Sequence, residues 1–395
     1  MRTVDAAGLS IGDDHPPRIM GVLNISEESP YKPSVFDDPG QAAEYVDTEL
    51  IEQGADIVDV GLESANKRFE VLTPEQELDR LQTAIQTIES VGGDAVFSIE
   101  TRYHEVAEAA IEGGFDMVND ICGFADPKLP EVCADYGVAV AKMASPPNLE
   151  RPGAVEETPW TERKSGEWAD RADYVDEVYE ALKQNGLTEK TIVDPAFGGW
   201  SEAKTIDDDR ETFRRLREFR GLGQPILVSI NRKNFLRSIA DRSTEEALPV
   251  SLAATAMAVE RGAHVIRTHD VAETRDAALV GDTFTRSRLR DDDVGVEQLD
   301  VTTVSEADRH CERVGTISET AAQSVVEVFE LTRLSMTQRD RLASHAPAHG
   351  AVFAPGTDDA DLLIGSPAAM EALASDVGDE GRLGVALETI AARIE

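Results

Sequence analysis

The feature that most constrains the fold is a strict alternation of short apolar runs with amphipathic stretches over residues 18–286. The stretches between the runs carry apolar residues at helical spacing, and several end near a glycine, as helices commonly do. Eight runs read as buried strands: Arg18–Asn24, Asp56–Glu63, Ala95–Thr101, Met117–Phe124, Ala139–Ser145, Thr191–Gly198, Pro225–Lys233 and His264–Asp270. Eight β/α units in about 270 residues predict an α/β fold, a TIM (β/α)8 barrel over residues 18–286.

The segments on either side of the barrel break this pattern. Residues 1–17 hold two short runs around a Gly-Asp-Asp turn, which predicts an N-terminal hairpin that closes one end of the barrel. Residues 287–395 begin with an acidic, arginine-rich linker at Ser287–Asp293 and predict a small C-terminal α/β appendage, with packing or dimerisation favoured over a second activity. Its expected helices are Ser305–Val314, Ile317–Arg333, Pro367–Val377 and Leu383–Ile394, and its expected strands are Gly350–Ala354 and Asp361–Ile364.

The charge balance excludes several classes of partner. The chain has 38 Lys and Arg residues against 76 Asp and Glu residues, a formal charge of −38. This charge argues against nucleic acid and against an anionic membrane surface. An ordinary acidic protein is one interpretation. We favour adaptation to molar salt, because so large an excess of one charge repels itself unless it is screened.

The cysteines and the hydropathy indicate a cellular location. Cys122, Cys133 and Cys311 have no metal-ligand spacing and are too few for a disulfide framework, so they predict small buried residues in a reducing compartment. No run approaches the 18 or so apolar residues of a membrane span, and residues 1–17 have no apolar signal core. We expect a cytoplasmic protein.

Polar residues stand at the ends of seven of the eight predicted strands. TIM-barrel active sites form where the carboxyl ends of the strands meet, so these side chains are expected to converge. Each one alone is more often a turn, cap or solvated residue than a functional one. The set is Asn24, Glu63, Glu100, Asn119, Asp194, Lys233, Arg267 and His269.

The chemistry of this set is complementary. Lys233, Arg267 and His269 offer cationic donors suited to a phosphate or diphosphate. Asn119 and Asp194 provide donors and acceptors for the edge of a flat heterocycle, and an asparagine oxygen such as that of Asn24 suits Mg²⁺. Cations at the mouth of a strongly acidic protein indicate an anionic substrate.

Seven segments of residues 18–285 resemble, in order, the motifs of the dihydropteroate synthase family. One such motif alone is weak evidence for the family, whereas seven motifs at successive strand ends are strong evidence. The segment Glu28-Ser29-Pro30-Tyr31-Lys32 is more similar to archaeal members than to bacterial ones. The seven segments are Gly21-Val22-Leu23-Asn24-Ile25-Ser26, Asp59-Val60-Gly61-Leu62-Glu63-Ser64, Ser98-Ile99-Glu100-Thr101, Val118-Asn119-Asp120-Ile121-Cys122-Gly123, Ile192-Val193-Asp194-Pro195, Asn231-Arg232-Lys233-Asn234-Phe235 and Arg267-Thr268-His269-Asp270-Val271.

The resemblance implies a pterin-binding TIM barrel that acts as a transferase in folate synthesis. The implied reaction condenses 7,8-dihydropterin-6-ylmethyl diphosphate with 4-aminobenzoate and gives 7,8-dihydropteroate and pyrophosphate. By analogy the diphosphate leaves first, and the amine attacks a resonance-stabilised pterin cation. Asn24 would then help to hold Mg²⁺ on the diphosphate, with Arg267 and His269 as anion anchors.

The same resemblance implies roles for the remaining positions. Asn119 and Asp194 would bind the pterin edge, and Lys233 would contact the ring. Glu100 would sit beside the developing cation, and Ser64 would contact substrate from the loop after the second strand. Because carboxylates stabilise positive charge and cations stabilise a leaving anion, this assignment is physically consistent.

The chain departs from the family pattern in four places. Glu100 replaces the usual Asp and moves the carboxylate by about 1 Å or more, a distance that matters in positioned catalysis. Pro30 stands where Phe is common, and Ser64-Ala65-Asn66-Lys67 lacks the usual Arg, for which Lys67 or Arg68 is the nearest substitute. The run after the sixth strand contains Trp200 in place of a glycine-rich sequence.

Three other functions stay open on the sequence alone. A pterin-dependent methyltransferase shares the barrel but needs no diphosphate anchors. A variant synthase that joins the pterin to a larger arylamine, as in methanopterin synthesis, fits the altered loops. A non-catalytic pterin-binding protein would explain the change at Glu100. For the synthase we expect small-molecule substrates and a homodimer.

The charge of −38 predicts that stability depends on salt. Lowering KCl from about 1 M to about 0.1 M lengthens the Debye length from roughly 3 Å to roughly 10 Å, so repulsion among the carboxylates grows. We expect the free energy of unfolding to fall over this range, measured by denaturant titration with circular dichroism. Sucrose at matched osmolality is the control for solute exclusion, and full stability at low salt would contradict the prediction.

Overall fold

The structure is a computed structural model that describes residues 1–26, 28–29, 31–64, 69–291, 293–357, 359–378 and 381–394. The chain forms two compact units, Met1–Ser287 and Arg288–Glu395, which are described separately below. Within the described ranges, no helix has both the length and the apolar character to cross a membrane.

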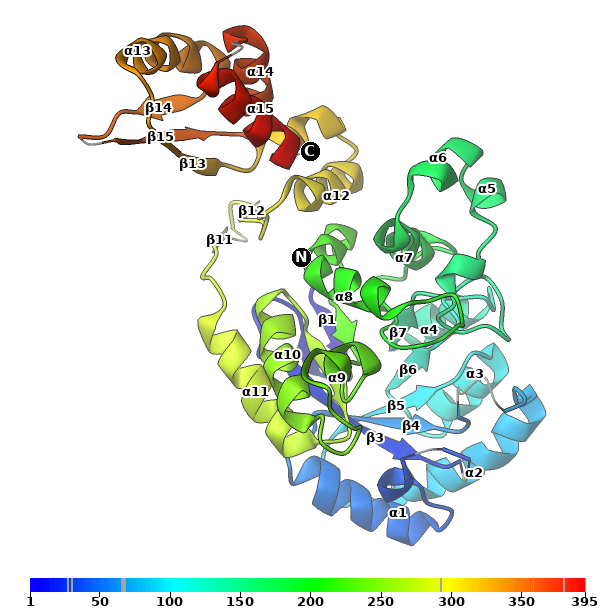
Figure 1. The fold of residues 1–395 in the computed structure, drawn as a ribbon. Helices are drawn as coiled ribbons and strands as arrows, with labels where there is room; N and C mark the ends of the chain where they lie inside the picture. The colour runs from blue at the N-terminus through cyan, green and yellow to red at the C-terminus, as the bar shows by residue number, and fades with distance from the viewer. Residues whose placement is uncertain are drawn as a thin grey trace. The chain divides into compact units, whose positions relative to one another are not determined.

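The first unit is built on eight parallel strands (Figure 1). They are paired in the order β8-β7-β6-β5-β4-β3-β10-β9. A parallel bridge between Val193 and Ile226 joins the two ends of this order, so the sheet closes on itself. The prediction of a TIM barrel is confirmed. The strands are β3 (Arg18–Asn24), β4 (Ile57–Gly61), β5 (Val96–Glu100), β6 (Met117–Asp120), β7 (Ala139–Met143), β8 (Thr191–Asp194), β9 (Leu227–Val228) and β10 (Val265–Thr268).

Helices surround the barrel, and several of them begin at a residue whose side chain caps the first turn. Thr73, Asp173 and Thr205 each form a capping box, in which the cap side chain and the third helical residue satisfy each other's backbone amide. The helices of the unit are α1 (Pro39–Tyr45), α2 (Pro74–Ser90), α3 (His104–Glu112), α4 (Leu129–Tyr136), α5 (Trp160–Arg163), α6 (Gly166–Arg171), α7 (Tyr174–Lys183), α8 (Ile206–Arg214), α9 (Asn234–Ala240), α10 (Leu248–Glu260) and α11 (Val271–Phe284). A π-helical turn, η2 (Val46–Ile51), extends α1, and 3-10 turns lie at η1 (Lys32–Ser34), η3 (Val155–Glu157) and η4 (Leu216–Leu222).

The N-terminal hairpin closes the barrel at the amino ends of the strands. Strands β1 (Val4–Ala6) and β2 (Leu9–Ile11) pair antiparallel, and their buried side chains pack with the apolar residues that fill the barrel interior. Asp13 follows the hairpin and holds it through ion pairs with Arg220 (2.9 Å) and His264 (3.0 Å). The expected hairpin is confirmed. Because it covers this end of the barrel, we expect a substrate to reach the interior from the carboxyl ends of the strands.

The second unit is a small α/β structure with its own apolar core. Strands β13 (Glu327–Thr332), β15 (Ala360–Gly365) and β14 (Val352–Ala354) form an antiparallel sheet in that order, and β11 (Arg290–Asp291) pairs with β12 (Val296–Glu297). Its helices are α12 (Val304–Val314), α13 (Met336–His345), α14 (Pro367–Val377) and α15 (Arg382–Ile394), with 3-10 turns η5 (Ser318–Gln323) and η6 (Ala346–His349).

Two sequence-based expectations for this second unit are wrong. The helix expected over residues 317–333 is a 3-10 turn followed by β13. Phe329 and Leu331 point towards the core while Val328 and Glu330 are exposed, which is the two-residue period of a strand, and β15 supplies the partner. Helix α13 was not expected from the sequence. Among the cysteines, Cys122 and Cys133 are buried as predicted, whereas Cys311 is only half-buried.

Candidate active site

The candidate site residues lie at the carboxyl end of the barrel. Strand register sets three of them in one row, because Gly61 on β4 pairs with both Asn24 and Glu100, and Glu100 pairs with Asn119. Asp194 ends β8, and Arg267 lies within β10. Lys233 directly precedes α9, and His269 directly follows β10.

A buried charge network joins four strands at this end. The guanidinium of Arg267 donates from Nε to Asp59 Oδ2 (2.7 Å) and from Nη2 to Glu100 Oε2 (2.7 Å). Asp59 also accepts a hydrogen bond from Asn119 Nδ2 (2.9 Å) and one from Ser98 Oγ (2.8 Å). Two of the predicted residues, Arg267 and Asn119, are therefore connected through one carboxylate that the sequence did not single out, and Glu100 joins them through Arg267.

Asp59 is the residue that sequence reasoning missed. It stands in the middle of β4 rather than at its end, so a search of strand ends passes over it. Its side chain is fully buried and shares the inward side of the strand with Ile57. A carboxylate in an otherwise apolar strand is a usable signal, because an acidic side chain is almost never fully buried without a partner.

Burial changes the acidity of the site. It raises the pKa of Glu100 to about 7, although the Arg267 charge opposes the shift. Burial also raises the pKa of Asp194 to about 6, against the hydrogen bond that its carboxylate accepts from the Ala196 amide. Burial and the nearby Arg267 lower the pKa of Lys233. The pKa of each group is therefore shifted from its ordinary value, as is common at functional sites.

A cavity of ≈ 280 Å³ opens beside this network. Three cations, Arg232, Lys233 and Arg267, line it together with His269 and Tyr31. Its full lining is Val22, Tyr31, Ser229, Asn231, Arg232, Lys233, Thr244, Arg267, Thr268 and His269. Hollow shape, cations and polar groups suit an anionic ligand.

His269 differs from the expectation of a third cation. Burial and the neighbouring Arg267 lower its pKa to about 3, so the imidazole is neutral near pH 7. Its Nδ1 is buried and has no hydrogen-bond partner among the described residues. The ring of Tyr31 stacks on it with centroids 4.1 Å apart. His269 can therefore serve as a neutral donor or acceptor, where the sequence led us to expect a cation.

The position of Lys233 depends on the loop after β8. Gly198 has φ +115°, and a Cβ there would lie 2.9 Å from Lys233 Nζ, so only glycine leaves room for the ammonium. The Gly198 amide donates to Asp209 (3.1 Å), which also pairs with Lys204 (2.8 Å). Lys233 Nζ lies 5.7 Å from the centre of the Trp200 ring.

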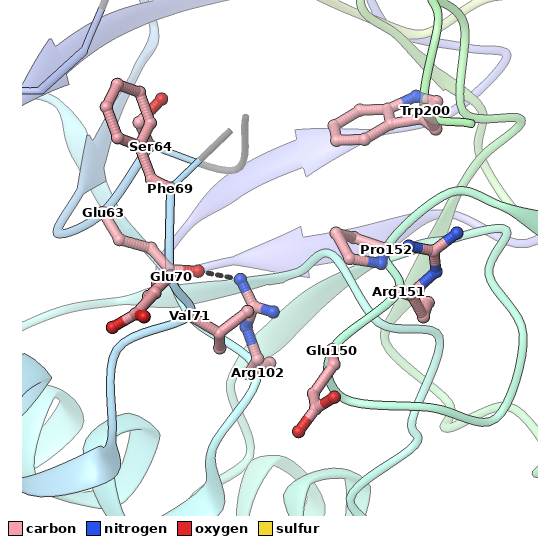
Figure 2. Close-up of a pocket in the computed structure, with 10 residues that line it drawn as sticks. All are labelled: Glu63, Ser64, Phe69, Glu70, Val71, Arg102, Glu150, Arg151, Pro152 and Trp200. Carbon is pink, nitrogen blue, oxygen red and sulfur yellow. Dashed lines mark ion pairs between the residues drawn. The ribbon is translucent and has the colours of Figure 1, made fainter. Parts of the chain in front are cut away.

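Ser64 lies in a second, smaller cavity of ≈ 90 Å³ (Figure 2). Glu63 is not available to a ligand in the way that the sequence suggested, because it forms an ion pair with the buried Arg102. Trp200 lines the same cavity on the side opposite Ser64 (Figure 2). The departures noted at Pro30 and at residues 65–68, including Lys67 and Arg68, lie outside the described residues.

Asn24 has one oxygen that suits a hard cation. Its Nδ2 donates to Ser34 Oγ (2.8 Å), which fixes the orientation of the amide, and its Oδ1 accepts a long bond from Ser29 Oγ (3.3 Å). A Cβ at Gly61 would lie 3.2 Å from this oxygen, so the glycine keeps space beside it. The residues present therefore fit a single protein ligand to Mg²⁺, which usually keeps several waters and substrate oxygens.

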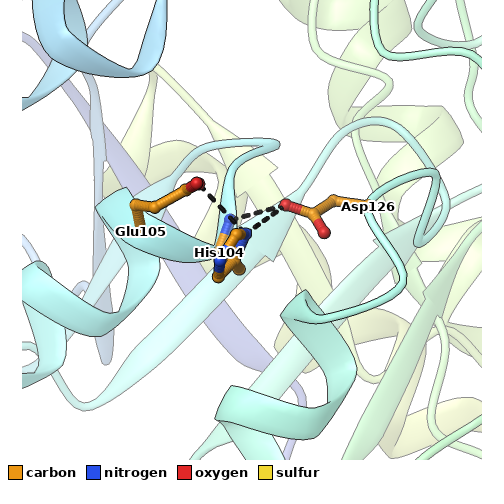
Figure 3. A group of neighbouring side chains, drawn as sticks. All are labelled: His104, Glu105 and Asp126. Carbon is orange, nitrogen blue, oxygen red and sulfur yellow. Dashed lines mark hydrogen bonds and ion pairs between the residues drawn. The ribbon is translucent and has the colours of Figure 1, made fainter.

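One further cluster of potential metal ligands lies at the start of α3 (Figure 3). His104 Nδ1 is 2.7 Å from Asp126 Oδ2 and 3.0 Å from Glu105 Oε2. Asp126 also accepts the backbone amides of His104 (2.9 Å) and Lys128 (3.0 Å). These bonds give the cluster a structural role as a cap at the starts of α3 and α4.

Comparison with known proteins identifies the class of this barrel. The family model for pterin binding enzymes matches residues 20–269. The chain is 31% identical over 271 residues to the dihydropteroate synthase of Clostridium beijerinckii, which covers 68% of this chain and 94% of the relative. It is also 31% identical over 264 residues to a probable bifunctional folylpolyglutamate synthase/dihydropteroate synthase of Halobacterium salinarum. That match covers 67% of this chain and only 31% of the relative.

Solved structures agree with the sequence relatives. The dihydropteroate synthase of Coxiella burnetii in complex with pteroic acid has a TM-score of 0.57 and 28% identity, and covers 73% of this chain and 99% of that chain. The dihydropteroate synthase of Thermus thermophilus in complex with 4-aminobenzoate has a TM-score of 0.56 and 27% identity, with coverage of 72% and 100%. The first unit is thus a pterin-binding barrel. The chain belongs to the pterin binding enzyme family and, within it, to the dihydropteroate synthases, which are transferases.

The environment of His269 predicts an unusual titration. Because the pKa is lowered to about 3 in the folded protein, against 6.5 for the free side chain, the folded state binds its proton less well than the unfolded state does. The stability contributed by the neutral ring is present above pH 6.5 and is lost as pH falls towards 3. We expect the His269 NMR signals to show a neutral imidazole down to about pH 5, with His269→Gln to assign them. A midpoint near 6.5, the ordinary value, would contradict this environment.

Proposed function

We propose that the barrel unit condenses 7,8-dihydropterin-6-ylmethyl diphosphate with 4-aminobenzoate, giving 7,8-dihydropteroate and pyrophosphate. The observation that carries the proposal is the convergence of Arg267, Asp59, Glu100 and Asn119 at the barrel mouth, beside the cavity that Lys233 and His269 line. A pterin presents both donors and acceptors on its edge, and its diphosphate is an anion. This arrangement offers partners for both.

The pterin is held by the buried polar groups of the barrel interior. Asp194 accepts hydrogen bonds from the pyrimidine N–H groups, and these donors favour its ionised form although burial raises its pKa to about 6. Asn119, whose Nδ2 is bound to Asp59, presents its amide oxygen to the ring. The ammonium of Lys233 lies against the ring.

The cations act on the leaving group. The C–O bond between the pterin methylene carbon and the diphosphate breaks, and its electron pair leaves with the diphosphate. Arg267 and Lys233 stabilise the negative charge that develops, and the neutral His269 donates one hydrogen bond. Groups fixed in advance of the reaction stabilise such charge most effectively.

Glu100 balances the other side of the reaction. The carbon left by the diphosphate is a pterin methylene cation, and the Glu100 carboxylate beside Arg267 stabilises it electrostatically. The nitrogen of the arylamine then forms the new C–N bond and loses one proton to solvent. No protein nucleophile is needed.

Mg²⁺ is the cofactor that we assign to this reaction. Asn24 Oδ1 would be its protein ligand, and the diphosphate and waters would complete its coordination. The ion would supply positive charge against the diphosphate oxygens. Asn24 itself is oriented by Ser34 whether or not the ion is bound.

The second substrate enters from the loops. Ser64 and Trp200 line the smaller cavity next to the mouth, and Trp200 also contacts Lys233. We assign to this side the binding of 4-aminobenzoate, the ligand named for the Thermus thermophilus structure. More residues support the assignment of the pterin site than support the assignment of the arylamine site.

We also propose that the enzyme is a cytoplasmic homodimer. Helices α9, α10 and α11 lie side by side (Figure 1) and expose large apolar side chains, an arrangement typical of an interface. These side chains are Ile239, Met257, Leu279, Val280 and Phe284.

Turnover by the purified chain tests the proposed reaction. In molar KCl with Mg²⁺ and both substrates, we expect one pyrophosphate to be released for each dihydropteroate formed, measured by coupled phosphate detection and mass spectrometry. Lys233→Ala should lower kcat/KM by more than about 100-fold, because it removes a fixed charge near the leaving group. Arg267→Lys should lower it by a similar factor, because a lysine cannot reproduce the two-donor geometry that pairs with Asp59 and Glu100.

The control for these variants is Lys183→Ala on the outer helix α7, which should keep wild-type kinetics. Turnover with a longer arylamine but not with 4-aminobenzoate would change only our assignment of the second substrate. Absence of product with any arylamine, or near-normal rates for both Lys233→Ala and Arg267→Lys, would contradict the proposed function.

A further inference from the structure

Arg232 occupies an unusual place next to the site. It is one of few described residues other than glycine with a left-handed backbone, at φ +54°, a conformation that costs free energy and is commonly kept for a functional reason. Its amide donates to Ser251 Oγ on α10 (2.9 Å). Lys233 is the next residue, so the backbone of Arg232 sets the direction in which Lys233 leaves the chain.

The side chain of Arg232 makes four hydrogen bonds to protein oxygens. Nε and Nη2 donate to the two oxygens of Asp270 (2.8 Å each), and Nη1 donates to the backbone oxygens of Thr244 and Glu245 (2.8 Å each). Asp270 accepts a further bond from Asn231 Nδ2 (2.9 Å). Although Arg232 lines the cavity, four of its five N–H donors point at protein oxygens and its charge is balanced by Asp270.

These bonds tie together the segments that carry two of the site residues. Asp270 directly follows His269, and Arg232 directly precedes Lys233. The backbone oxygens of Thr244 and Glu245 belong to the loop between α9 and α10. One planar guanidinium therefore fixes the end of β10 against the loop after β9, a geometry that a lysine cannot reproduce.

We propose that Arg232, paired with Asp270, is a positioning residue that holds Lys233 and His269 facing the same cavity, and does not itself bind the substrate anion. The inference rests on the proposed function, because the Arg232–Asp270 pair would position residues that bind the diphosphate. A shift of about 1 Å in either anchor is enough to weaken positioned binding strongly.

The two possible roles of Arg232 predict opposite effects at Asp270. If Arg232 positions the site, Asp270→Asn breaks the bidentate pair and weakens anion binding. If Arg232 binds the anion directly, Asp270→Asn frees the guanidinium and strengthens anion binding. Inorganic pyrophosphate is a suitable probe, since it reports the anion site without turnover.

The experiment compares Arg232→Lys, Asp270→Asn and the double variant in the full chain, in molar KCl with Mg²⁺. Calorimetry gives the dissociation constant of pyrophosphate, and steady-state kinetics give the KM of the arylamine. We expect each single variant to raise the pyrophosphate constant by about 10-fold or more. The arylamine KM should stay within about twofold. The double variant should be no weaker than the worse single one, because both changes break the same pair.

Arg237→Lys is the matched control. Arg237 also bonds to Thr244, through Thr244 Oγ1 (2.9 Å), but it makes no bond to Asp270 in the described structure, so its substitution should leave pyrophosphate binding within about twofold. Circular dichroism checks that each variant is folded. If Arg232→Lys does not fold, the pyrophosphate affinity of Asp270→Asn alone tests the inference.

The outcomes separate the inference from the proposed function. Wild-type turnover with unchanged pyrophosphate binding in both single variants would overturn the positioning role alone. Tighter binding by Asp270→Asn would also overturn it and make Arg232 an anion ligand. A wild-type chain that neither binds pyrophosphate nor forms product would overturn the proposed function and the positioning role together.

Discussion

The structure of the barrel mouth depends on the pairing of one arginine, mostly shielded from solvent, with two carboxylates. Arg267, Asp59 and Glu100 come from β10, β4 and β5, and they meet in the barrel interior, where an unpaired charge is strongly disfavoured. Removing one partner of such a buried pair typically costs about 3–5 kcal/mol. Strand register, the bond from Asn119 to Asp59 and the direction in which Arg267 faces the cavity are therefore fixed together.

The same constraint explains how an acidic chain keeps cations at the mouth of its barrel. The chain carries a net charge of −38, yet its mouth cavity is lined by Arg232, Lys233 and Arg267. Arg232 is paired with Asp270, and Arg267 with two acids, so these two cations are held in a fixed geometry and their charge is balanced. Neutral His269 fits this interpretation, because nearby cations and burial suppress its protonation.

The sequence predicted the barrel because each unit repeats the same local physics, a buried strand followed by an amphipathic helix. It also predicted that the strand-end residues lie at one end of the barrel, since parallel topology alone places them there. It missed Asp59 because that residue lies inside a strand, and it assigned a charge to His269 because a pKa depends on neighbours distant in the chain. The strand at residues 327–332 was expected to be helical because its partner, β15, lies about 30 residues further on.

The most direct test of the central claim is the affinity of Asp59→Asn for the dihydropterin diphosphate. Asp59 is fully buried, accepts bonds from Arg267 and Asn119, and lies within the barrel. We expect at least about a 10-fold rise in the dissociation constant for a folded variant, because Arg267 loses one negative partner and one acceptor oxygen becomes a donor. The control is Asp116→Asn. Asp116 lies just before β6 and accepts a hydrogen bond from the Phe97 amide of β5, so this variant should bind the dihydropterin diphosphate with wild-type affinity. Wild-type affinity in Asp59→Asn would contradict the account.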